Sequence, residues 1–146
     1  MMNSRQHEMF KWLAEILHPV VNFYSTHTLQ DTFHFCQDLD EFVEAHSDMR
    51  NTFMCSFDVT SLFTNVPLDE VLSICLDTLY RKELVPKPSV PETLLKKMLE
   101  KATKDVEFSF DNKLYQQVDG VAMGSPLGPV LANIFVGYCE KLIEER

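Results

Sequence analysis

SFDVTSLFTNVP, residues 56–67, places Asp58 at the end of an apolar run, ahead of a polar turn and a proline. The run itself, residues 53–59, is short and mostly apolar, which is typical of a buried strand. Asn65-Val66-Pro67 favours a helix start, because the N–H that proline lacks would be unpaired in a first turn anyway. The pattern predicts a strand, a turn and a helix in succession, with a carboxylate at the junction.

Two interpretations of Asp58 are open. A carboxylate at the end of a buried strand costs desolvation energy unless a cation pairs with it. Mg²⁺ is one such cation, since it takes carboxylate and backbone oxygens, and the N–H groups of the turn could then receive phosphate oxygens. Alternatively, Asp58 is an ordinary strand-end residue or a helix cap, which is a common place for an acid.

The segment GVAMGSPLGP, residues 120–129, contains three glycines and two prolines. Glycine lets a backbone approach a ligand closely and adopt positive φ. Ser125 and Pro126 form a helix start whose free N–H groups could face a phosphate or a base. The segment matches neither GxxxxGK[ST] nor GxGxxG, and a tight structural turn would explain it equally well.

Residues 1–50 are predicted to form two helices. In the first, Phe10, Leu13, Ile16, Leu17 and Val20 recur at helical spacing, with an interruption at Pro19. The second is predicted to be capped by Asp31 and to end at His46-Ser47-Asp48.

Three further helices are predicted downstream. They start at Pro67, at Ser89-Val90-Pro91-Glu92, which has the spacing of a capping box, and at Ser125-Pro126. The residues expected to face inward are Leu68, Val71, Leu72, Cys75 and Leu79 in the first, Leu94, Leu95, Met98, Leu99 and Ala102 in the second, and Leu127, Val130, Leu131, Ile134, Phe135 and Tyr138 in the third.

A β-hairpin is predicted where residues 106–110 and 114–118 flank Asp111-Asn112-Lys113. Together with the helices it indicates an α+β fold that is helix-rich, with a short antiparallel sheet. The proline-rich break at residues 85–89 is too short to separate two cores. The 146 residues, 45% of them apolar, are therefore expected to form one domain.

The charge of the chain is unevenly distributed. The net charge of −9 argues against nucleic-acid binding if taken alone. Residues 1–66 hold three basic and nine acidic residues, whereas residues 81–113 hold eight basic and six acidic ones. The sequence contains no apolar run of about 18 residues, so no membrane span is predicted. The first residues lack the features of a secretory signal. We therefore expect an intracellular protein, cytoplasmic or nuclear.

The four cysteines, Cys36, Cys55, Cys75 and Cys139, form no CxxC pair. We expect them to be reduced and buried, as small apolar side chains. His34 and Cys36 do not predict a zinc site, because no second pair stands at ligand spacing.

The two motif segments together resemble a known family. FDVTSLFTNVP, residues 57–67, followed by YQQVDGVAMGSPLGPVLANIF, residues 115–135, closely resembles the palm of Penelope-like element reverse transcriptases. Residues 13–42 also look like that family's stretch upstream of the catalytic strand. The resemblance implies a partial right-hand polymerase palm, with residues 1–50 as the upstream helical segment and residues 51–146 as the palm itself.

The resemblance assigns roles to the first motif. Asp58 matches the first metal-binding, catalytic aspartate, with the Val59 backbone carbonyl as a further metal contact. Ser61, Leu62 and Phe63 match the turn whose N–H groups hold the incoming triphosphate. Phe63 also matches the bulky steric gate that excludes a 2′-hydroxyl, although a core aromatic is the alternative interpretation.

The resemblance also assigns a role to the second motif. Gly124, Ser125 and Pro126 match the residues that pack beside the nascent base pair and the template. Met123 departs from the glutamine that related enzymes often carry before Gly-Ser, so it receives no hydrogen-bonding role.

The implied reaction is nucleotidyl transfer to a primer 3′-hydroxyl with two Mg²⁺ ions, on an RNA or DNA template with dNTP. One aspartate cannot hold two ions, and the family's adjacent pair of aspartates does not occur in this chain. The thumb and GIY-YIG endonuclease regions are absent too, and the basic fingers segment would precede residue 1. We therefore expect this chain to be inactive alone, to bind nucleic acid weakly or not at all, and to self-associate through an uncovered apolar flank.

Three hypotheses follow. The chain is a truncated retroelement product, a part of an intact RNA-directed DNA polymerase, or a non-enzymatic acidic interaction module derived from a palm. An in-frame aspartate pair after Arg146 would distinguish the second from the first. The third requires that Asp58 be dispensable.

Overall fold

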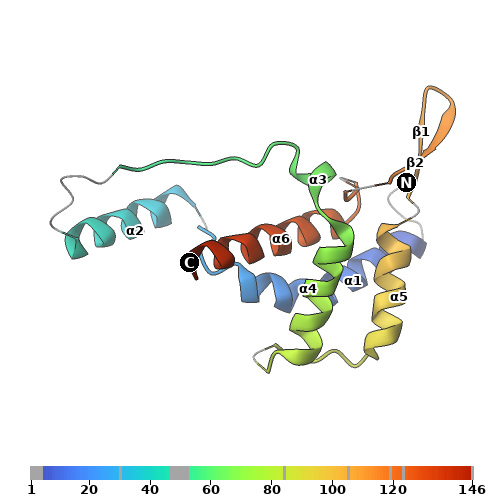
Figure 1. Cartoon of the computed structure of the whole chain (residues 1–146), viewed down its shortest axis with the longest axis horizontal. Helices are drawn as coiled ribbons and strands as arrows, with labels where there is room; N and C mark the ends of the chain where they lie inside the picture. The colour runs from blue at the N-terminus through green and yellow to red at the C-terminus, as the bar shows by residue number, and fades with distance from the viewer. Residues whose placement is uncertain are drawn as a thin grey trace. The chain divides into compact units, whose positions relative to one another are not determined.

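The computed structural model describes residues 5–29, 31–46, 53–83, 85–104, 106–118, 120–122 and 124–145. Its elements are α1 (Arg5–Tyr24), α2 (Thr32–Ala45), α3 (Leu62–Asn65), α4 (Leu68–Arg81), α5 (Glu92–Thr103), β1 (Glu107–Phe110), β2 (Lys113–Gln116) and α6 (Leu127–Glu144) (Figure 1). The described part is helix-rich, with one two-stranded antiparallel sheet. The chain divides into a larger unit, Met1–Thr26 with Ser61–Arg146, and a smaller unit, His27–Thr60. No described helix combines the length and apolarity needed to cross a membrane.

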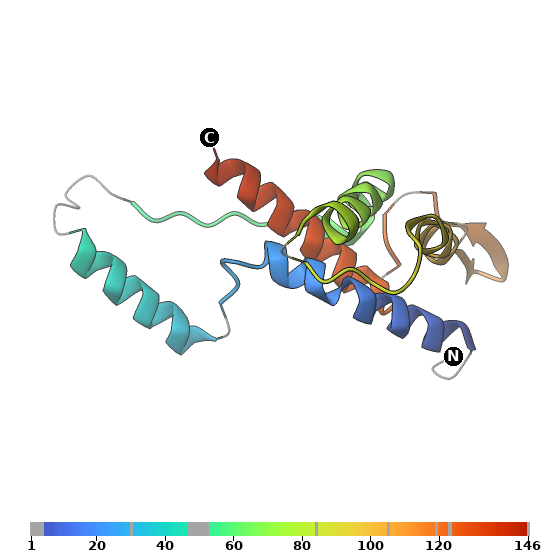
Figure 2. The same ribbon diagram turned by 90° about the horizontal axis from the view of Figure 1, so that it is seen from below.

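The core of the larger unit lies where α1, α4 and α6 meet, with α5 packed on α4. α1 and α6 lie side by side in both views (Figures 1 and 2). Each helix turns one apolar stripe inward, as helical periodicity requires. The buried residues include Leu13, Leu17 and Val20 of α1, Val71, Leu72, Cys75 and Leu79 of α4, and Leu127, Leu131 and Ile134 of α6.

α1 and α6 approach each other closely at Gly137. A Cβ atom at this position would lie 2.7 Å from the backbone oxygen of Tyr24, so no side chain fits. The buried hydroxyl groups of Tyr24 and Thr78 share a hydrogen bond of 3.0 Å, which connects α1 to α4. Burial raises the pKa of the Tyr24 hydroxyl. Close backbone contact and a buried hydrogen bond therefore join three helices at one place.

α1 continues through Pro19, so the predicted interruption is wrong. Proline lacks the N–H that would bond the carbonyl four residues earlier, which costs roughly 3 kcal/mol in a helix interior. Leu17 and Val20, on either side of it, are fully buried. Burying such side chains stabilises by about 1.5–3 kcal/mol each, which is enough to keep the helix continuous.

α5 begins at Glu92, with Pro91 at its N-cap and no side-chain cap bond. The predicted capping box at Ser89 is therefore wrong. A cap bond needs a side-chain oxygen at the N-cap residue itself, and that position is occupied by proline.

The inward stripe of α5 consists of Leu95, Leu99 and Ala102, which are buried, with Met98 packed against the core. Leu94 was predicted to face inward and is instead 50% exposed. It lies about 100° around the helix from Leu95, which places it at the edge of the stripe.

β1 and β2 form a hairpin where one was predicted, but the strands are shorter and Lys113, which was predicted in the turn, is the first residue of β2. Phe108 lies opposite Tyr115, and Phe110 lies opposite Lys113. Asp111 and Asn112 have φ values of 50° and 55°. Positive φ at both central residues is the type I′ turn, whose twist matches the strands that it joins.

In the smaller unit, α2 begins at its predicted cap. The Asp31 carboxylate accepts a hydrogen bond of 2.9 Å from the N–H of His34. His46 is the C-cap, as predicted, whereas Ser47 and Asp48 lie outside the described residues. No residue of α2 is buried, and its apolar residues Phe33, Phe42 and Val43 are exposed.

Residues 53–59 form no strand, so the predicted buried strand is wrong. A segment becomes a strand only by pairing its backbone with a neighbour, and in the described part β1 and β2 bond only each other. Phe53, Met54 and Phe57 are 84%, 76% and 95% exposed. The apolar run alone did not specify what would cover it.

The prediction that all four cysteines are buried is also corrected. Cys75 is buried and Cys139 is half-buried, whereas Cys36 and Cys55 are exposed. The two exposed thiols belong to the smaller unit, whose described residues provide no buried apolar core. Burial raises the pKa of the Cys75 thiol to about 12.

Thiol labelling should follow this exposure. With iodoacetamide at pH 8 under native conditions, Cys36 and Cys55 should be alkylated first and Cys75 last, because the attacking species is an accessible thiolate. A thiol with a raised pKa stays protonated below that pKa, so Cys75 should remain protected at pH 9 as well. Peptide mass spectrometry gives the order, and labelling in guanidinium chloride, where all four should react, is the control. Rapid native labelling of Cys75 would contradict the packing of α4.

Candidate functional site

The turn that follows Asp58 is held by its own polar side chains. Ser61 adopts a left-handed conformation, with φ 53° and ψ 45°, directly before α3. Its carbonyl accepts hydrogen bonds from the Thr64 N–H at 3.1 Å, the Thr64 hydroxyl at 2.9 Å and the Asn65 amide at 3.1 Å. A non-glycine residue with positive φ persists only where its surroundings fix it, and these three bonds do so.

The glycine-rich loop contacts this turn directly. The Val121 N–H donates to the Phe63 carbonyl at 2.7 Å. Gly120 has φ +76°, and a Cβ atom there would lie 2.5 Å from the Phe63 oxygen and 2.7 Å from the Thr64 Cα. Glycine is therefore required both by the backbone conformation and by the close approach of α3.

The start of α6 is positioned by the same loop. The Ser125 hydroxyl accepts from the Leu127 N–H at 3.3 Å, and the Ser125 carbonyl accepts from the Gly128 N–H at 3.1 Å. A Cβ atom at Gly128 would lie 2.6 Å from the Ala122 oxygen and 3.9 Å from Cδ1 of Phe63. The Phe63 ring thus lies beside the first turn of α6 and is only half-buried.

The structure brings the two predicted nucleotide-binding segments together in the larger unit. Ser61, Leu62 and Phe63 adjoin the loop that contains Gly124, Ser125 and Pro126. A Cβ atom at the exposed Gly124 would meet nothing within 4 Å, so the space beside this residue is open. Met123 lies outside the described residues.

Asp58 and Val59 belong to the smaller unit and are exposed. Asp58 does not cap α3, whose N-cap is Ser61 without a side-chain bond, and it does not end a strand. Neither ordinary interpretation of the residue is met in the described structure. The metal-binding role that the resemblance implies for Asp58 stays a prediction.

A magnesium site requires several oxygen donors that converge on one point. Across the described ranges, no three His, Cys, Asp or Glu side chains converge on a point that could hold a metal ion. Mg²⁺ prefers near-octahedral oxygen coordination. The Asp58 carboxylate and the Val59 carbonyl alone do not fit that requirement, and one aspartate does not fit a pair of ions.

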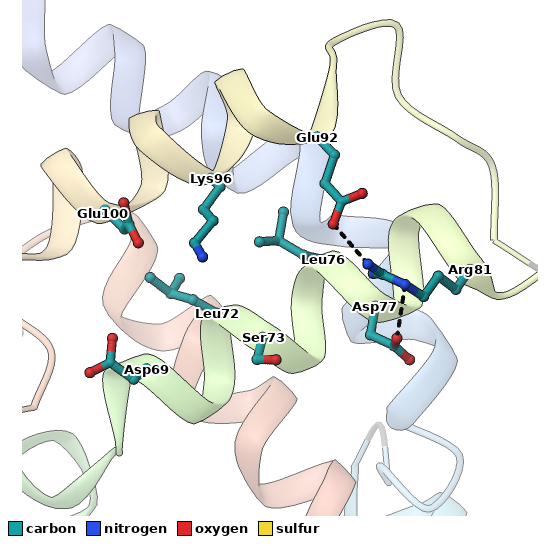
Figure 3. A pocket seen from close by; sticks show the side chains of 9 residues that line it. All are labelled: Asp69, Leu72, Ser73, Leu76, Asp77, Arg81, Glu92, Lys96 and Glu100. Carbon is teal, nitrogen blue, oxygen red and sulfur yellow. Dashed lines mark hydrogen bonds and ion pairs between the residues drawn. The ribbon is translucent and has the colours of Figure 1, made fainter.

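A charged cleft that the sequence did not indicate lies between α4 and α5 (Figure 3). Its volume is about 580 Å³. Arg81 pairs with Asp77 at 3.6 Å and with Glu92 at 3.1 Å, and Lys96 points into the cleft. These pairs are exposed, so each contributes little to stability. None of the predicted site residues lines this cleft.

A second cavity, of about 550 Å³, adjoins the start of α4. Lys104 at the end of α5 pairs with Asp69 in the first turn of α4. The lining also includes Pro67, Leu68, Gln116, Gln117 and Val118. The only sequence signal for Lys104 was the basic excess of residues 81–113. Local sequence could not predict its ion pair, because the acidic partner lies on a different helix.

Replacing Gly120 should test the contact between loop and turn. Gly120→Ala should lower the free energy of unfolding by about 1–3 kcal/mol or more, because it adds both backbone strain and a clash with α3. Gly124→Ala is the matched control, since its Cβ atom meets open space, and it should change stability by less than about 0.5 kcal/mol. Urea unfolding measures both. Equal effects of the two substitutions would contradict the close approach at Gly120.

The turn at Phe63 and the loop at Gly124 belong to the larger unit, whereas Asp58 belongs to the smaller one. Tight local bonding holds both the turn and the loop in place. Comparison of the chain with models of protein families, with curated proteins and with solved structures found no match.

Proposed function

We propose that this chain is the palm region of a retroelement RNA-directed DNA polymerase of the Penelope-like kind. The observation that supports the proposal most is the contact between the turn at Phe63 and the loop of residues 120–128. The Val121 N–H bonds the Phe63 carbonyl, and the Phe63 ring lies beside Gly128. In the family that the sequence resembles, both segments touch the incoming nucleotide, so their adjacency is what such a site requires.

Each segment would contact a different part of the nucleotide. The first N–H groups of a helix have no acceptor within it, so those of Ser61, Leu62 and Phe63 are suited to triphosphate oxygens. The uncovered part of the Phe63 ring would face the sugar. The open space beside Gly124 would accommodate the nascent base pair.

Catalysis requires more than these residues supply. Bound magnesium ions would stabilise the charge of the transferring phosphate, and Asp58 is the one ligand side chain that the first motif provides. We therefore assign the activity to an enzyme that contains this chain together with further metal-binding aspartates. Its substrates would be dNTP and a primer on an RNA or DNA template.

A second candidate function is an acidic interaction module. The smaller unit favours it, because α2 buries none of its residues and exposes Phe33 and Phe42. Residues 27–60 contain seven acidic residues and one basic residue, Arg50. Such a surface suits a protein partner with an apolar groove and a basic rim. This function would survive Asp58→Asn, whereas polymerase activity would not.

The 146-residue chain itself should not extend a primer. With Mg²⁺ or Mn²⁺, a primed template and dNTP, no incorporation is expected, because the metal ligands are incomplete. Denaturing gel electrophoresis of a labelled primer measures it. Template-dependent incorporation that disappears in Asp58→Asn would overturn the claim that further aspartates are needed.

Sugar selection should depend on Phe63 in the complete enzyme. Phe63→Ala should remove the clash with a 2′-hydroxyl and relax deoxyribonucleotide preference by one or more orders of magnitude, since a built clash is worth several kcal/mol. Steady-state incorporation of matched deoxy- and ribonucleotides measures the ratio.

Leu62→Ala is the control for packing. Leu62 is half-buried against the same core and is not expected to meet the sugar, so its loss should lower stability without changing the selectivity ratio. If Phe63→Ala behaves in the same way, Phe63 is a packing residue. Full burial of such a ring would make its loss cost about 3–5 kcal/mol.

A further inference from the structure

The β1 strand of the hairpin has an open edge. Alternate residues of a strand direct their backbone N–H and C=O groups toward opposite sides. The N–H of Gln117 bonds the carbonyl of Val106 at 2.8 Å, so Val106 and every second residue after it direct these groups toward β2. The backbone groups of Glu107 and Ser109 therefore point away from β2. In the part of the chain that the structure describes, no further strand pairs with them.

The hairpin is too small to be stable as a sheet by itself. An isolated pair of strands is marginally stable in water, and a stable sheet needs further strands with an apolar face or a helix packed on it. All residues of both strands are exposed, and the hairpin projects beyond α5 (Figures 1 and 2). Phe108, Phe110 and Tyr115, which share one face, are 48%, 69% and 43% exposed. The hairpin thus presents an apolar face and an open edge, the two features by which sheets acquire strands.

A second copy of β1 fits this edge in one register. Two copies related by a twofold axis pair in antiparallel order. Glu107 of each copy exchanges backbone hydrogen bonds with Ser109 of the other only where Phe108 lies opposite Phe108 of the second copy. Every outward N–H and C=O group of β1 is then paired. A shift by one residue would instead bring the outward groups against groups that already bond β2.

Charge and backbone conformation disfavour a shift by two residues. In one direction Glu107 would lie opposite Glu107 of the second copy, and like charges directly opposite each other destabilise a sheet. In the other direction it would lie opposite Asp111, a turn residue with φ 50° that does not continue the strand. In the register centred on Phe108, the Glu107 carboxylate faces the Ser109 hydroxyl, which can donate a hydrogen bond to it.

Apolar side chains meet on the other face in the same register. Phe108 lies opposite Phe108 of the second copy, and Phe110 lies opposite the half-buried Val106. These positions are of the kind that exchanges no backbone bonds, where facing side chains approach most closely. Aromatic pairs and pairs of an aromatic with a β-branched residue both stabilise antiparallel strands. The ring face of one hairpin would therefore continue into that of the other.

We propose that two copies of this chain associate through β1 and form one antiparallel sheet from their two hairpins. The contact is isologous, because each copy contributes the same strand. It does not rest on the proposed polymerase function, since no residue of β1 belongs to the turn at Phe63 or to residues 120–128. The paired surface is small and each copy has a net charge of −9, so the dimer is weak and salt strengthens it.

Sedimentation velocity of the 146-residue chain tests the proposal. A reversible equilibrium of monomer and dimer is expected, with Kd on the order of 10⁻⁵–10⁻³ M. Ser109→Pro should raise Kd about tenfold or more, because proline removes an outward N–H and places its ring at the edge. The hairpin itself should persist, since that N–H does not face β2.

Leu114→Pro is the matched control. Leu114 lies directly opposite Ser109 and also directs its N–H outward, but at the edge of β2. We assign the contact to β1 because Gln116, on the β2 edge, already has an interaction within the chain. Leu114→Pro should therefore associate as the unmodified chain does, and circular dichroism should show both proline variants folded. Equal effects of the two substitutions, or a chain that stays monomeric at about 1 mM, would overturn the proposal.

Ser109→Lys tests the register without changing the backbone. The ammonium group would face Glu107 of the second copy, so Kd should fall about three- to tenfold. Leu114→Lys adds the same charge to the same face of the hairpin, one strand away from the contact, and should lower Kd less. Equal shifts in the two lysine variants would show that net charge controls association and would overturn the assigned pairing. Association that Ser109→Pro leaves intact would also overturn it, because another surface, such as the exposed apolar residues of α2, would then join the copies.

Discussion

The contacts of α6 are the constraint on which the larger unit depends. In its second half, Gly137 lets the helix meet the backbone of α1 at Tyr24. At its start, Gly128 lets the loop carbonyl of Ala122 and the ring of Phe63 approach. Both contacts are possible because a hydrogen atom stands where any other residue has a Cβ atom. The position of the Phe63 turn is therefore set by the same helix that closes the core.

Much of the fold could be predicted from local sequence. The stripes of α4 and α6, the Asp31 cap and the Asp111-Asn112 turn follow from periodicity and turn chemistry, which act over a few residues. Local sequence could not predict the structure at Pro19, at Ser89 or over residues 53–59. Burial of Leu17 and Val20 overrides the proline, and a strand exists only where another strand pairs with it. These outcomes depend on residues distant in the sequence.

The candidate site, too, could be predicted from local sequence only in part. The residue types of the turn and the loop were visible in the motifs, and the tight glycine turn was one of the interpretations left open. The bond from Val121 to Phe63 was not visible, because it joins residues far apart in the chain. The sequence also could not predict that the Phe63 ring is half-buried, because composition does not distinguish one of the eleven phenylalanines from another. Asp58 is the opposite case. Its motif was visible in the sequence, but in the described structure the residue is exposed to solvent.

The contact between Tyr24 and Gly137 also has a consequence for synthesis on the ribosome. About a hundred residues separate the two positions, and a ribosome adds roughly 5–20 residues per second. The apolar stripe of α1 therefore emerges roughly 5–20 s before the helix that covers it. During that interval Leu13, Leu17 and Val20 are accessible to chaperones that bind nascent apolar segments, because α1 meets this neighbour only after Gly137 has been synthesised.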